Sequence, residues 1–254
     1  MPTDAMLRNE KKYLVPNRLM DSLRNRVNDF VRPDIFVRDN PEGLPQYTVR
    51  SIYFDSRRLE AYHEKLGGVL FRRKFRVRGY HGPEPEEQVV LEIKRKIGNK
   101  VKKHRAFVNY SHLDELLANG QIDQYVENTE YEPNAREDAG RFLFHLKKKQ
   151  FVPTCLITYD REAYHGLLDS RVRITFDKNL RSRMFPPTGQ LFSEEQLKKF
   201  FPGHFILEIK YFSDEMPRWA RSLIQEFMLR NEALSKYTLG IDAHLGIGNP
   251  STNY

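Results

Sequence analysis

Apolar and charged residues alternate along several segments of this chain, most regularly between residues 71 and 96. The even-numbered positions from 72 to 78 are all Arg or Lys, whereas the odd-numbered ones include Phe71, Phe75 and Val77. Successive side chains of a strand point to opposite faces. The pattern therefore predicts a strand with one cationic face, and residues 89–96 predict a second strand of the same kind.

A Gly-Asn dipeptide at residues 98–99 predicts a two-residue hairpin turn, which fixes the register of a third strand. Lys94 then faces Lys103, and Glu92 faces Arg105. Two lysines about 5 Å apart repel by roughly a few kcal/mol at an effective dielectric of about 20. A solvated basic surface is the alternative interpretation. Because the same pattern recurs elsewhere, we expect an anion between these strands.

The period of the apolar positions predicts the remaining elements. Further strands are expected at residues 8–15, 47–55, 101–108, 154–164, 171–177 and 205–212. Helices are expected at residues 17–30, 57–66, 111–117, 141–150 and 213–232, with Asn17 and Ser111 as N-caps, and a short helix is expected after a capping box at residues 193–196. Residues 79–87 read as a loop and residues 120–137 as a linker or outer insertion.

An antiparallel sheet with one apolar and one charged face normally turns the charged face to water. Here the charged faces hold many cations with acids regularly interspersed, as in the L-E-I-K sequence that occurs at residues 91–94 and again at residues 207–210. A closed barrel is the alternative geometry, in which the inward faces line a basic channel and helices cover the outward apolar faces. We therefore predict an α+β fold that forms a single domain over residues 1–254.

Composition narrows the classes of partner. The chain has 254 residues, of which 39% are hydrophobic and 12% aromatic, enough for a sizeable core. Its formal net charge of +8 indicates an anionic partner, such as a phosphate compound, nucleic acid or an acidic membrane surface. Cys155 is the single cysteine, and no stretch reads as a signal peptide or a transmembrane helix. We therefore expect a cytoplasmic protein.

Nine short motifs occur in an order that resembles one known family. They are R-x-E-x-K-Y at residues 8–13, S-I-Y-F-D at 51–55, K-x-R-x-R at 74–78, L-E-I-K at 91–94, K-x-R at 103–105, Y-x-R-x-A-Y at 159–164, R-I-T-F-D at 173–177, L-E-I-K-Y at 207–211 and S-K-Y-x-x-G at 235–240. Over residues 6–245 the chain resembles the VTC (vacuolar transporter chaperone) polyphosphate polymerase domain, a member of the CYTH-like triphosphate tunnel metalloenzyme superfamily. The resemblance implies an antiparallel eight-stranded β-barrel with helices packed outside, a bound triphosphate or polyphosphate, and Mn²⁺ or Mg²⁺.

The resemblance also implies a set of site residues. The phosphate-binding candidates are Lys12, Arg76, Arg78, Lys94, Lys103, Arg105, Arg161, Arg173, Lys210 and Lys236. The catalytic candidates are Lys94, Arg161, Glu208 and Lys236, and the metal-ligand candidates are Glu208 and Glu10. Glu92 is an alternative metal ligand, or a salt-bridge partner of Arg105. Arg8 stands where the hydrolytic and cyclase branches have the first glutamate of E-x-E-x-K, a departure that favours the polymerase-like branch.

Phosphoryl transfer asks a protein mainly to position its substrates and to stabilise charge on phosphate oxygens. Arginine can grip phosphate with two hydrogen bonds, and lysine acts as a point charge. Magnesium and manganese take most of their oxygen ligands from phosphates and water, so one or two carboxylates suffice. The function we expect is polyphosphate synthesis from the γ-phosphate of ATP.

Three other functions remain open at this stage. A triphosphatase or a non-catalytic polyphosphate sensor is compatible with the same residues. A nucleic-acid-binding protein fits the basic charge and the aromatic content, but no recognisable nucleic-acid motif occurs. Metalloprotease, serine hydrolase and Walker-loop signatures are also absent from the sequence. A separate membrane protein is a further candidate partner, and the oligomeric state is left open.

Overall fold

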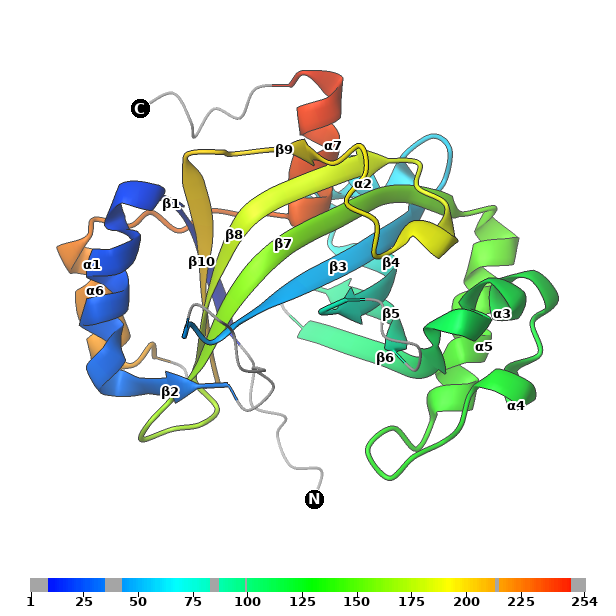
Figure 1. Ribbon diagram of the computed structural model, residues 1–254, viewed down its shortest axis with the longest axis horizontal. Coiled ribbons are helices and arrows are strands. Elements are labelled where there is room, and N and C mark those ends of the chain that lie inside the picture. Colours follow the sequence, from blue (N-terminus) through cyan, green and yellow to red (C-terminus); the bar gives the residue numbers. More distant parts are fainter. Residues whose placement is uncertain (1–8, 35–42, 83–86, 99, 213–214, 248–254) are drawn as a thin grey trace.

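A curled antiparallel sheet organises the computed structural model, which describes residues 9–34, 43–82, 87–98, 100–212 and 215–247 (Figure 1). Its strands are β1 (Asn9–Pro16), β2 (Val31–Pro33), β3 (Gln46–Asp55), β4 (Phe71–Tyr80), β5 (Gln88–Ile97), β6 (Lys100–Asn109), β7 (Val152–Gly166), β8 (Arg173–Met184), β9 (Lys198–Lys199) and β10 (His204–Tyr211). Eight of them lie in the order β1-β10-β8-β7-β3-β4-β5-β6, with β2 paired to β7 and β9 to β8. Because β1 and β10 pair within this one sheet, we propose that the chain forms a single domain.

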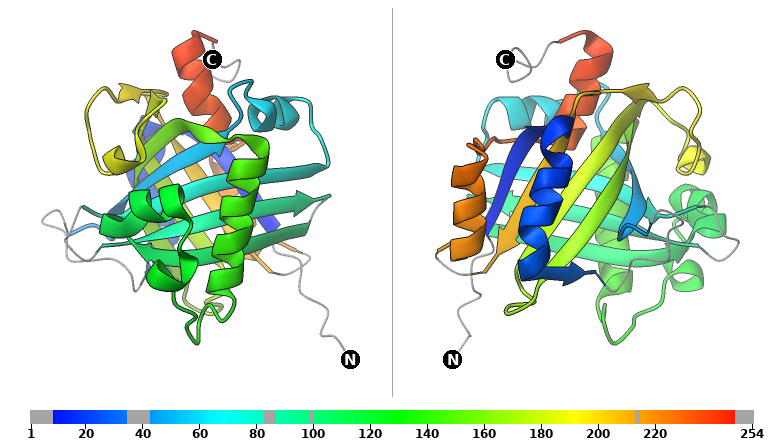
Figure 2. Two further views of the ribbon diagram at one scale, coloured as in Figure 1. Left: turned by 90° about the vertical axis from the view of Figure 1, so that its right-hand side faces the viewer. Right: turned by 60° about the vertical axis from the view of Figure 1, so that its left-hand side comes forward.

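Most of the helices cover the outside of the sheet, whereas α7 packs inside its curl. They are α1 (Met20–Val27), α2 (Glu60–Leu66), α3 (Leu113–Asn119), α4 (Ile122–Tyr125), α5 (Ala135–Lys149), α6 (Arg218–Glu226) and α7 (Lys236–Leu245), with 3-10 turns η1 (Asn17–Leu19), η2 (Asn28–Phe30), η3 (Tyr110–His112) and η4 (Thr188–Gln190). Figures 1 and 2 show α1 and α6 side by side on one flank and α3, α4 and α5 on the other. None of the helices in the described ranges has the length and apolar composition that crossing a bilayer requires.

The predicted hairpin register is confirmed. Lys94 lies opposite Lys103 and Glu92 opposite Arg105, and residues 98–99 connect β5 to β6. Gly98 has a φ of 56°, a left-handed conformation that glycine adopts without a steric penalty, whereas Asn99 lies outside the described residues. The alternation within β4 therefore places its even-numbered cations on one face of the sheet.

The expected closed eight-stranded barrel is not confirmed. Among the described residues, no backbone pairing joins β1 to β6, the two ends of the strand order. A segment before α7 instead covers the free edge of β1: Glu232 N donates to the carbonyl oxygen of Lys12 at 2.8 Å, and Lys12 N donates to Asn231 Oδ1 at 3.2 Å. Curvature nevertheless brings Lys94 Nζ on β5 to 4.0 Å from Glu10 Oε2 on β1. The sheet thus curls around its charged face.

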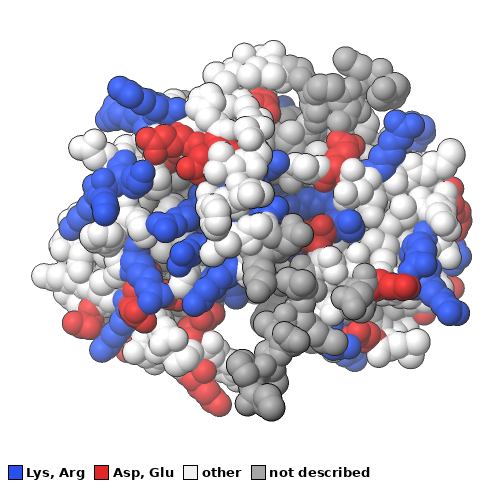
Figure 3. Space-filling model, turned by 180° about the vertical axis from the view of Figure 1, so that it is seen from behind, with Lys and Arg blue, Asp and Glu red and all other residues white. Residues whose placement is uncertain are grey.

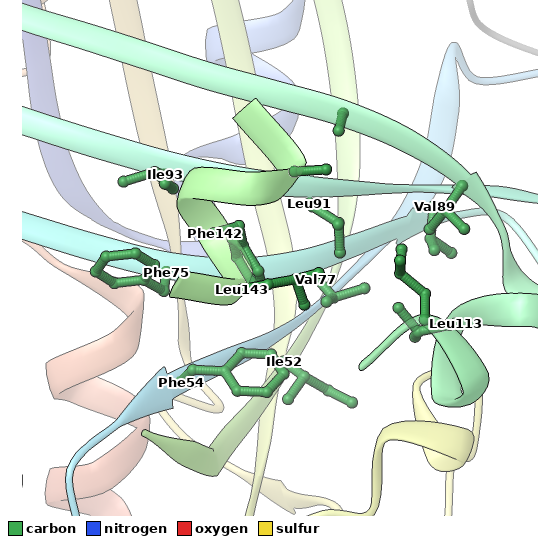
Figure 4. Packing of buried hydrophobic residues seen from close by; sticks show 14 of the residues in the cluster. Ile52, Phe54, Phe75, Val77, Val89, Leu91, Ile93, Leu113, Phe142 and Leu143 are labelled. Carbon is green, nitrogen blue, oxygen red and sulfur yellow. The ribbon is translucent and has the colours of Figure 1, made fainter. Parts of the chain in front are cut away.

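Two apolar clusters fill the spaces between the outer face of the sheet and the helices. Figure 4 shows Phe142 and Leu143 of α5 beside Phe75, Val77 and Leu91 of β4 and β5. The rings of Phe75 and Phe142 meet edge to face, with centroids 5.8 Å apart. The second cluster joins α1 and α6 to β1, β8 and β10. Burying each large apolar side chain contributes about 1.5–3 kcal/mol, so these outer clusters supply much of the fold's stability.

A third cluster lies on the inner face, where α7 packs inside the curl. Tyr237 and Ile241 of α7 contact Ile157 of β7 and Ile206 of β10. Ile157 and Ile206 share their strand faces with the charged side chains, because they precede Arg161 and Glu208 by an even number of residues. Gly240 permits the close approach, since a Cβ atom there would lie 2.3 Å from Ile157 Cδ1. The helix α7 therefore bounds the charged zone at one end.

Several sequence predictions for helices were wrong. Residues after the expected capping box form turns before β9, because Ser193 Oγ accepts from Glu195 N at 3.1 Å and closes a local turn. Residues 120–137 are not a linker, since they contain α4 and the first turn of α5. The helix α7 was not predicted at all.

The predicted caps also differ from the structure. The Asn17 side chain caps no helix; its Nδ2 donates to the carbonyl oxygen of Pro202 at 3.3 Å. Asn109 rather than Ser111 caps η3, through a 3.0 Å bond from Ser111 N to Asn109 Oδ1. Met228 lies within the range of the expected helix at residues 213–232, but it follows α6 and is 85% exposed.

Candidate functional site

Strand alternation places one family of side chains on the inner face of the sheet. Seven strands and the first turn of α7 contribute cations to it, so segments far apart in the sequence converge. Figure 3 shows basic side chains in the middle of the face opposite to that of Figure 1. The cations are Lys12, Lys74, Arg76, Arg78, Lys94, Lys103, Arg105, Arg161, Arg173, Lys210 and Lys236, and the carboxylates among them are Glu10, Glu92, Asp177 and Glu208.

Glu208 of β10 lies at the centre of the acidic side chains. In the sheet it lies opposite Lys12 of β1, and it forms ion pairs with Lys210 and, at 3.8 Å, with Arg161 Nη2. Burial raises the pKa of Glu208, but the charges of Lys210, Lys12, Lys236 and Arg161 outweigh it and hold the pKa well below its usual range. Glu208 is therefore a carboxylate at any physiological pH.

Glu10 of β1 is the second predicted metal ligand. Lys12 Nζ lies 2.6 Å from its Oε1, and Lys94 Nζ lies 4.0 Å from its Oε2. Burial and the charge of Glu208 raise the pKa of Glu10, but the charges of Lys12, Lys94 and Lys210 outweigh both effects and lower it to about 2. Glu10 lies opposite Lys210 and Glu208 lies opposite Lys12, so the two predicted ligands are diagonal neighbours on adjacent strands.

Asp177 of β8 is a member of the site that sequence analysis did not select. It accepts from Arg161 at 2.6 and 2.8 Å and pairs with Lys236 Nζ at 2.5 Å. Burial raises the pKa of Asp177, but the two cations lower it to about 2. Both cations also lie over the Tyr159 ring, at 5.2 and 4.7 Å from its centroid. The signal was available, since Asp177 shares a strand face with Arg173 within the R-I-T-F-D motif.

Glu92 joins the cations of β4 and β6. Its two oxygens accept from Arg76 and, at 3.2 Å, from Arg105 Nε. Burial raises the pKa of Glu92, but Arg76, Arg78 and their neighbours hold it well below its usual range. Arg78 Nε donates to Ser51 Oγ at 3.0 Å. The contacts of Glu92 are thus those of the salt-bridge alternative.

Three lysines form a row on adjacent strands of the inner face. Lys74, Lys94 and Lys103 lie opposite one another on β4, β5 and β6. Lys74 Nζ donates to Ser235 Oγ at 2.7 Å. Burial lowers the pKa of all three lysines, the charges of neighbouring cations lower it further, and for Lys103 it falls to about 7. We call this set the lysine row; Lys74 was quoted in a sequence motif but was not among the predicted site residues.

Two predicted phosphate ligands lie at the rim and have other partners. Arg173 Nη2 pairs with Asp34 at 2.7 Å and donates to Tyr47 OH at 2.9 Å. Arg105 pairs with Glu92 and, at 3.9 Å, with Glu132. Arg76, Arg161, Lys210 and Lys236 lie deeper, whereas Lys103 at the end of the lysine row is exposed.

Several buried polar atoms of the inner face have no hydrogen-bond partner among the described residues. They are Arg76 Nε, Arg173 Nε and Thr175 Oγ1, and Thr175 lies opposite Glu208. An unsatisfied buried donor costs about 1–3 kcal/mol, so these atoms are candidate contacts for water or for a polar ligand. With the lysine row, they give the inner face the character of an anion-binding surface.

The curled antiparallel sheet with its basic inner face is the arrangement expected from the resemblance to triphosphate tunnel proteins. The chain belongs to the VTC domain family, whose model matches residues 7–245. A similar fold occurs in the solved structure of a putative adenylyl cyclase from Hippeastrum, HpAC1, reported to have a dominant triphosphatase activity. The two chains are 13% identical with a TM-score of 0.51, over 95% of this chain and 97% of that one. A search of curated proteins found no match.

Proposed function

We propose that the protein transfers the γ-phosphoryl group of ATP to the end of a polyphosphate chain bound on the inner face. The observation that carries this proposal is the lysine row, whose like charges lie directly opposite one another. Such a row is costly until a polyanion neutralises it. The unsatisfied Arg76 Nε adds a donor for a phosphate oxygen beside the row.

We assign roles by position. Arg161 lies beside Glu208, Lys236 beside Asp177 and Lys94 beside Glu10, and these cations would stabilise the charge of the transferring phosphoryl group. The remaining cations would hold the flanking phosphates, and the rim arginines Arg105 and Arg173 would meet the chain where it enters or leaves. Phosphate binding by Lys12, Arg76, Arg78, Lys103 and Lys210 belongs to the same proposal.

A divalent ion fits the acidic part of the site when the substrate supplies further ligands. Within the described ranges, no group of three Asp, Glu, His or Cys side chains is arranged to hold a metal by itself. Glu208 and Glu10 offer carboxylate oxygens, the donors that Mg²⁺ and Mn²⁺ prefer, and they lie near one another. We propose that these two residues would hold the ion. When bound, it would supply charge neutralisation at the phosphate oxygens.

The ionisation of the carboxylates favours transfer over hydrolysis. In transfer, a terminal phosphate oxygen of the chain attacks the γ-phosphorus, the bond to the β–γ bridging oxygen breaks, and ADP leaves with that electron pair. The attacking oxygen is already anionic, so no general base is needed. Hydrolysis needs a base for water, yet Glu10, Glu92, Asp177 and Glu208 all have lowered pKa values. Triphosphate hydrolysis is the second candidate, supported by the activity reported for HpAC1.

The proposed chemistry also bears on the shape and location of the protein. We infer that the eight strands in the order β1-β10-β8-β7-β3-β4-β5-β6 act as the wall of a tunnel. Side chains of β1 and β5 would join its two ends. The approach of Lys94 to Glu10 supports this geometry. Use of ATP as the donor would place the protein in the cytoplasm.

The test combines activity and binding. The protein is incubated with ATP and Mn²⁺, chain products are resolved on a gel, released phosphate is measured, and affinities for tripolyphosphate and DNA are compared. Polyphosphate chains support the proposal. Phosphate without chains identifies a triphosphatase, binding without turnover a sensor, and preference for DNA a nucleic-acid-binding protein.

A matched pair of variants tests the site itself. Lys94→Met/Lys103→Met removes the facing inner lysines, whereas Arg95→Gln/Lys102→Gln removes the facing cations one position away on the same strands, which point outward. We expect the inner variant to lose at least tenfold in tripolyphosphate affinity and the outer variant to keep it. Equal losses would contradict an inner-face site.

A further inference from the structure

Exposed apolar side chains gather where α2 leads into β4 and where β5 turns into β6. Phe71 is 69% exposed and Leu70 is 65% exposed. Phe71 lies opposite Ile97, and Gly98 N donates to the carbonyl oxygen of Leu70 at 3.3 Å, so the two segments adjoin. We call this group the apolar tip; its members are Leu66, Val69, Leu70, Phe71, Ile97 and Val101.

A row of cations lies next to the apolar tip on the outer face of the sheet. Arg73 of β4 lies opposite Arg95 of β5, which lies opposite Lys102 of β6. We call these three residues the basic row. None of them forms an ion pair with a carboxylate in the part of the chain that the structure describes; Arg73 Nη1 has His145 Nε2 at 3.3 Å as its polar neighbour. Phe71 and Ile97 sit one step further along the same strand faces.

The last turn of α5 extends this basic surface. Burial lowers the pKa of His145, and the charges of Arg73, Lys148, Arg95 and Lys149 lower it further, which places all four cations near one ring. Lys148 and Lys149 end α5. A run of lysines at a helix end is usually only a solvated surface. Here it adjoins facing cations and exposed apolar side chains, a combination that solvation alone does not favour.

We propose that the apolar tip and the basic row dock the protein on an anionic membrane surface. Apolar side chains that insert at the headgroup boundary, with cations at headgroup level, are the two contributions that bind peripheral proteins to acidic bilayers. A soluble phosphate compound would leave the apolar tip in water. A second copy of this chain in a two-fold dimer would bring the same cations together, and their repulsion opposes that arrangement.

Vesicle flotation of the full chain tests the proposal. Vesicles of phosphatidylcholine alone are compared with vesicles that also contain phosphatidylserine. We expect the protein to float with the mixed vesicles only. Leu70→Ser/Phe71→Ser should abolish flotation, and Arg95→Gln/Lys102→Gln should weaken it about 25-fold, since each cation near the surface contributes about fivefold, or about 1 kcal/mol.

Matched controls separate this surface from other effects. Leu168→Ser removes an exposed leucine from the β7–β8 loop, and Arg18→Gln/Lys199→Gln removes two exposed cations elsewhere. Both controls should float like the unchanged protein. All variants should keep their tripolyphosphate affinity, which shows that they are folded and separates this proposal from the proposed function.

Three results would overturn the proposal. One is a folded, tripolyphosphate-binding protein that does not float with phosphatidylserine vesicles. Another is flotation that the tip and row variants leave unchanged. The third is a dimer, measured by light scattering, that Leu70→Ser/Phe71→Ser converts to a monomer, which would assign the apolar tip to contacts between copies.

Discussion

Glu208→Gln separates the proposed catalytic role of this carboxylate from its structural role. The substitution keeps the shape of the side chain and removes its charge. It leaves Lys210, Arg161 and Lys12 beside a neutral amide. Glu208 is 4% exposed, so water does little to replace the lost charge. The change therefore perturbs both the empty protein and the reaction.

The magnitudes follow from the contacts of Glu208. Removing one partner of a buried ion pair costs about 3–5 kcal/mol. At about 2–4 °C per kcal/mol for a chain of this size, the melting temperature should fall by roughly 6–12 °C at the lower cost. Loss of a negative charge should tighten metal-free tripolyphosphate binding about tenfold, so excess ligand should stabilise the variant by about 1.4 kcal/mol more than the unchanged protein and restore part of the lost stability. Turnover with Mn²⁺ should fall at least about a hundredfold, equivalent to roughly 2.7 kcal/mol.

Glu162→Gln is the matched control for this experiment. Glu162 is fully buried and also holds two cations, Arg24 at 2.5 Å and Lys178, but it lies on the outer face beneath α1. Its variant should lose similar stability without change in tripolyphosphate affinity or turnover. The assays are thermal unfolding with and without tripolyphosphate, calorimetric affinity, and phosphoryl transfer from ATP. Unchanged turnover in Glu208→Gln would refute the metal-ligand role, and equal ligand rescue of both variants would refute the inner-face phosphate site.

Three further predictions test the lysine row and the packing of α7. Bound polyanion should raise the pKa of Lys103 from about 7, so affinity should increase as the pH falls from about 9 to about 7, with proton uptake in calorimetry that is smaller in Lys103→Arg. In the unchanged protein, tripolyphosphate at a hundredfold excess over Kd should add about 2.7 kcal/mol of stability, seen as a rise in melting temperature. Lys94→Met should lose most of this rise but little or no stability without ligand. General unfolding of the variant would instead identify Lys94 as a structural residue. Gly240→Ala should lower the free energy of unfolding by about 1–3 kcal/mol, because its Cβ would clash with β7. Gly140→Ala in α5 should raise it by up to about 1 kcal/mol, because a Cβ there would lie 3.5 Å from its nearest neighbour, Ile122 Cδ1. Equal effects in denaturant unfolding would contradict the close approach of α7 to β7.

The strands and their register were predictable because they depend on local signals. Alternation assigns each side chain of β4 and β5 to a face, and the two-residue turn fixes which residues lie opposite, so the pairing of Lys94 with Lys103 followed from sequence alone. The cationic inner face could be predicted for the same reason. Curvature without closure could not, because it depends on the segment around Asn231, which pairs with the edge of β1 through an isolated bridge that no strand pattern marks.

The features that sequence analysis missed depend on tertiary contacts. The helix α7 has an N-cap at Ser235 and a left-handed Gly246 at its end, yet its apolar residues do not lie on one side, because α7 packs inside the curl. Asp177 carries no motif of its own; its role comes from the two cations that other elements bring to it. The expected helix after residues 193–196 does not form, and a turn closed by the Ser193 side chain takes its place. A capping pattern of four residues stabilises a helix too little when no apolar face is buried.

The inner face therefore combines two electrostatic regimes. Asp177 and Glu208 fix Arg161, Lys236 and Lys210 before any ligand arrives, so the ordering of these long side chains costs little at the moment of binding. The lysine row has no comparable set of acids to neutralise it. Its charges would therefore be neutralised mainly by a bound polyanion. We therefore expect the chain phosphates to contribute most of their binding energy along the lysine row. We expect the transferring group to lie beside Asp177 and Glu208, where the prearranged cations could stabilise the transition state without reorganising.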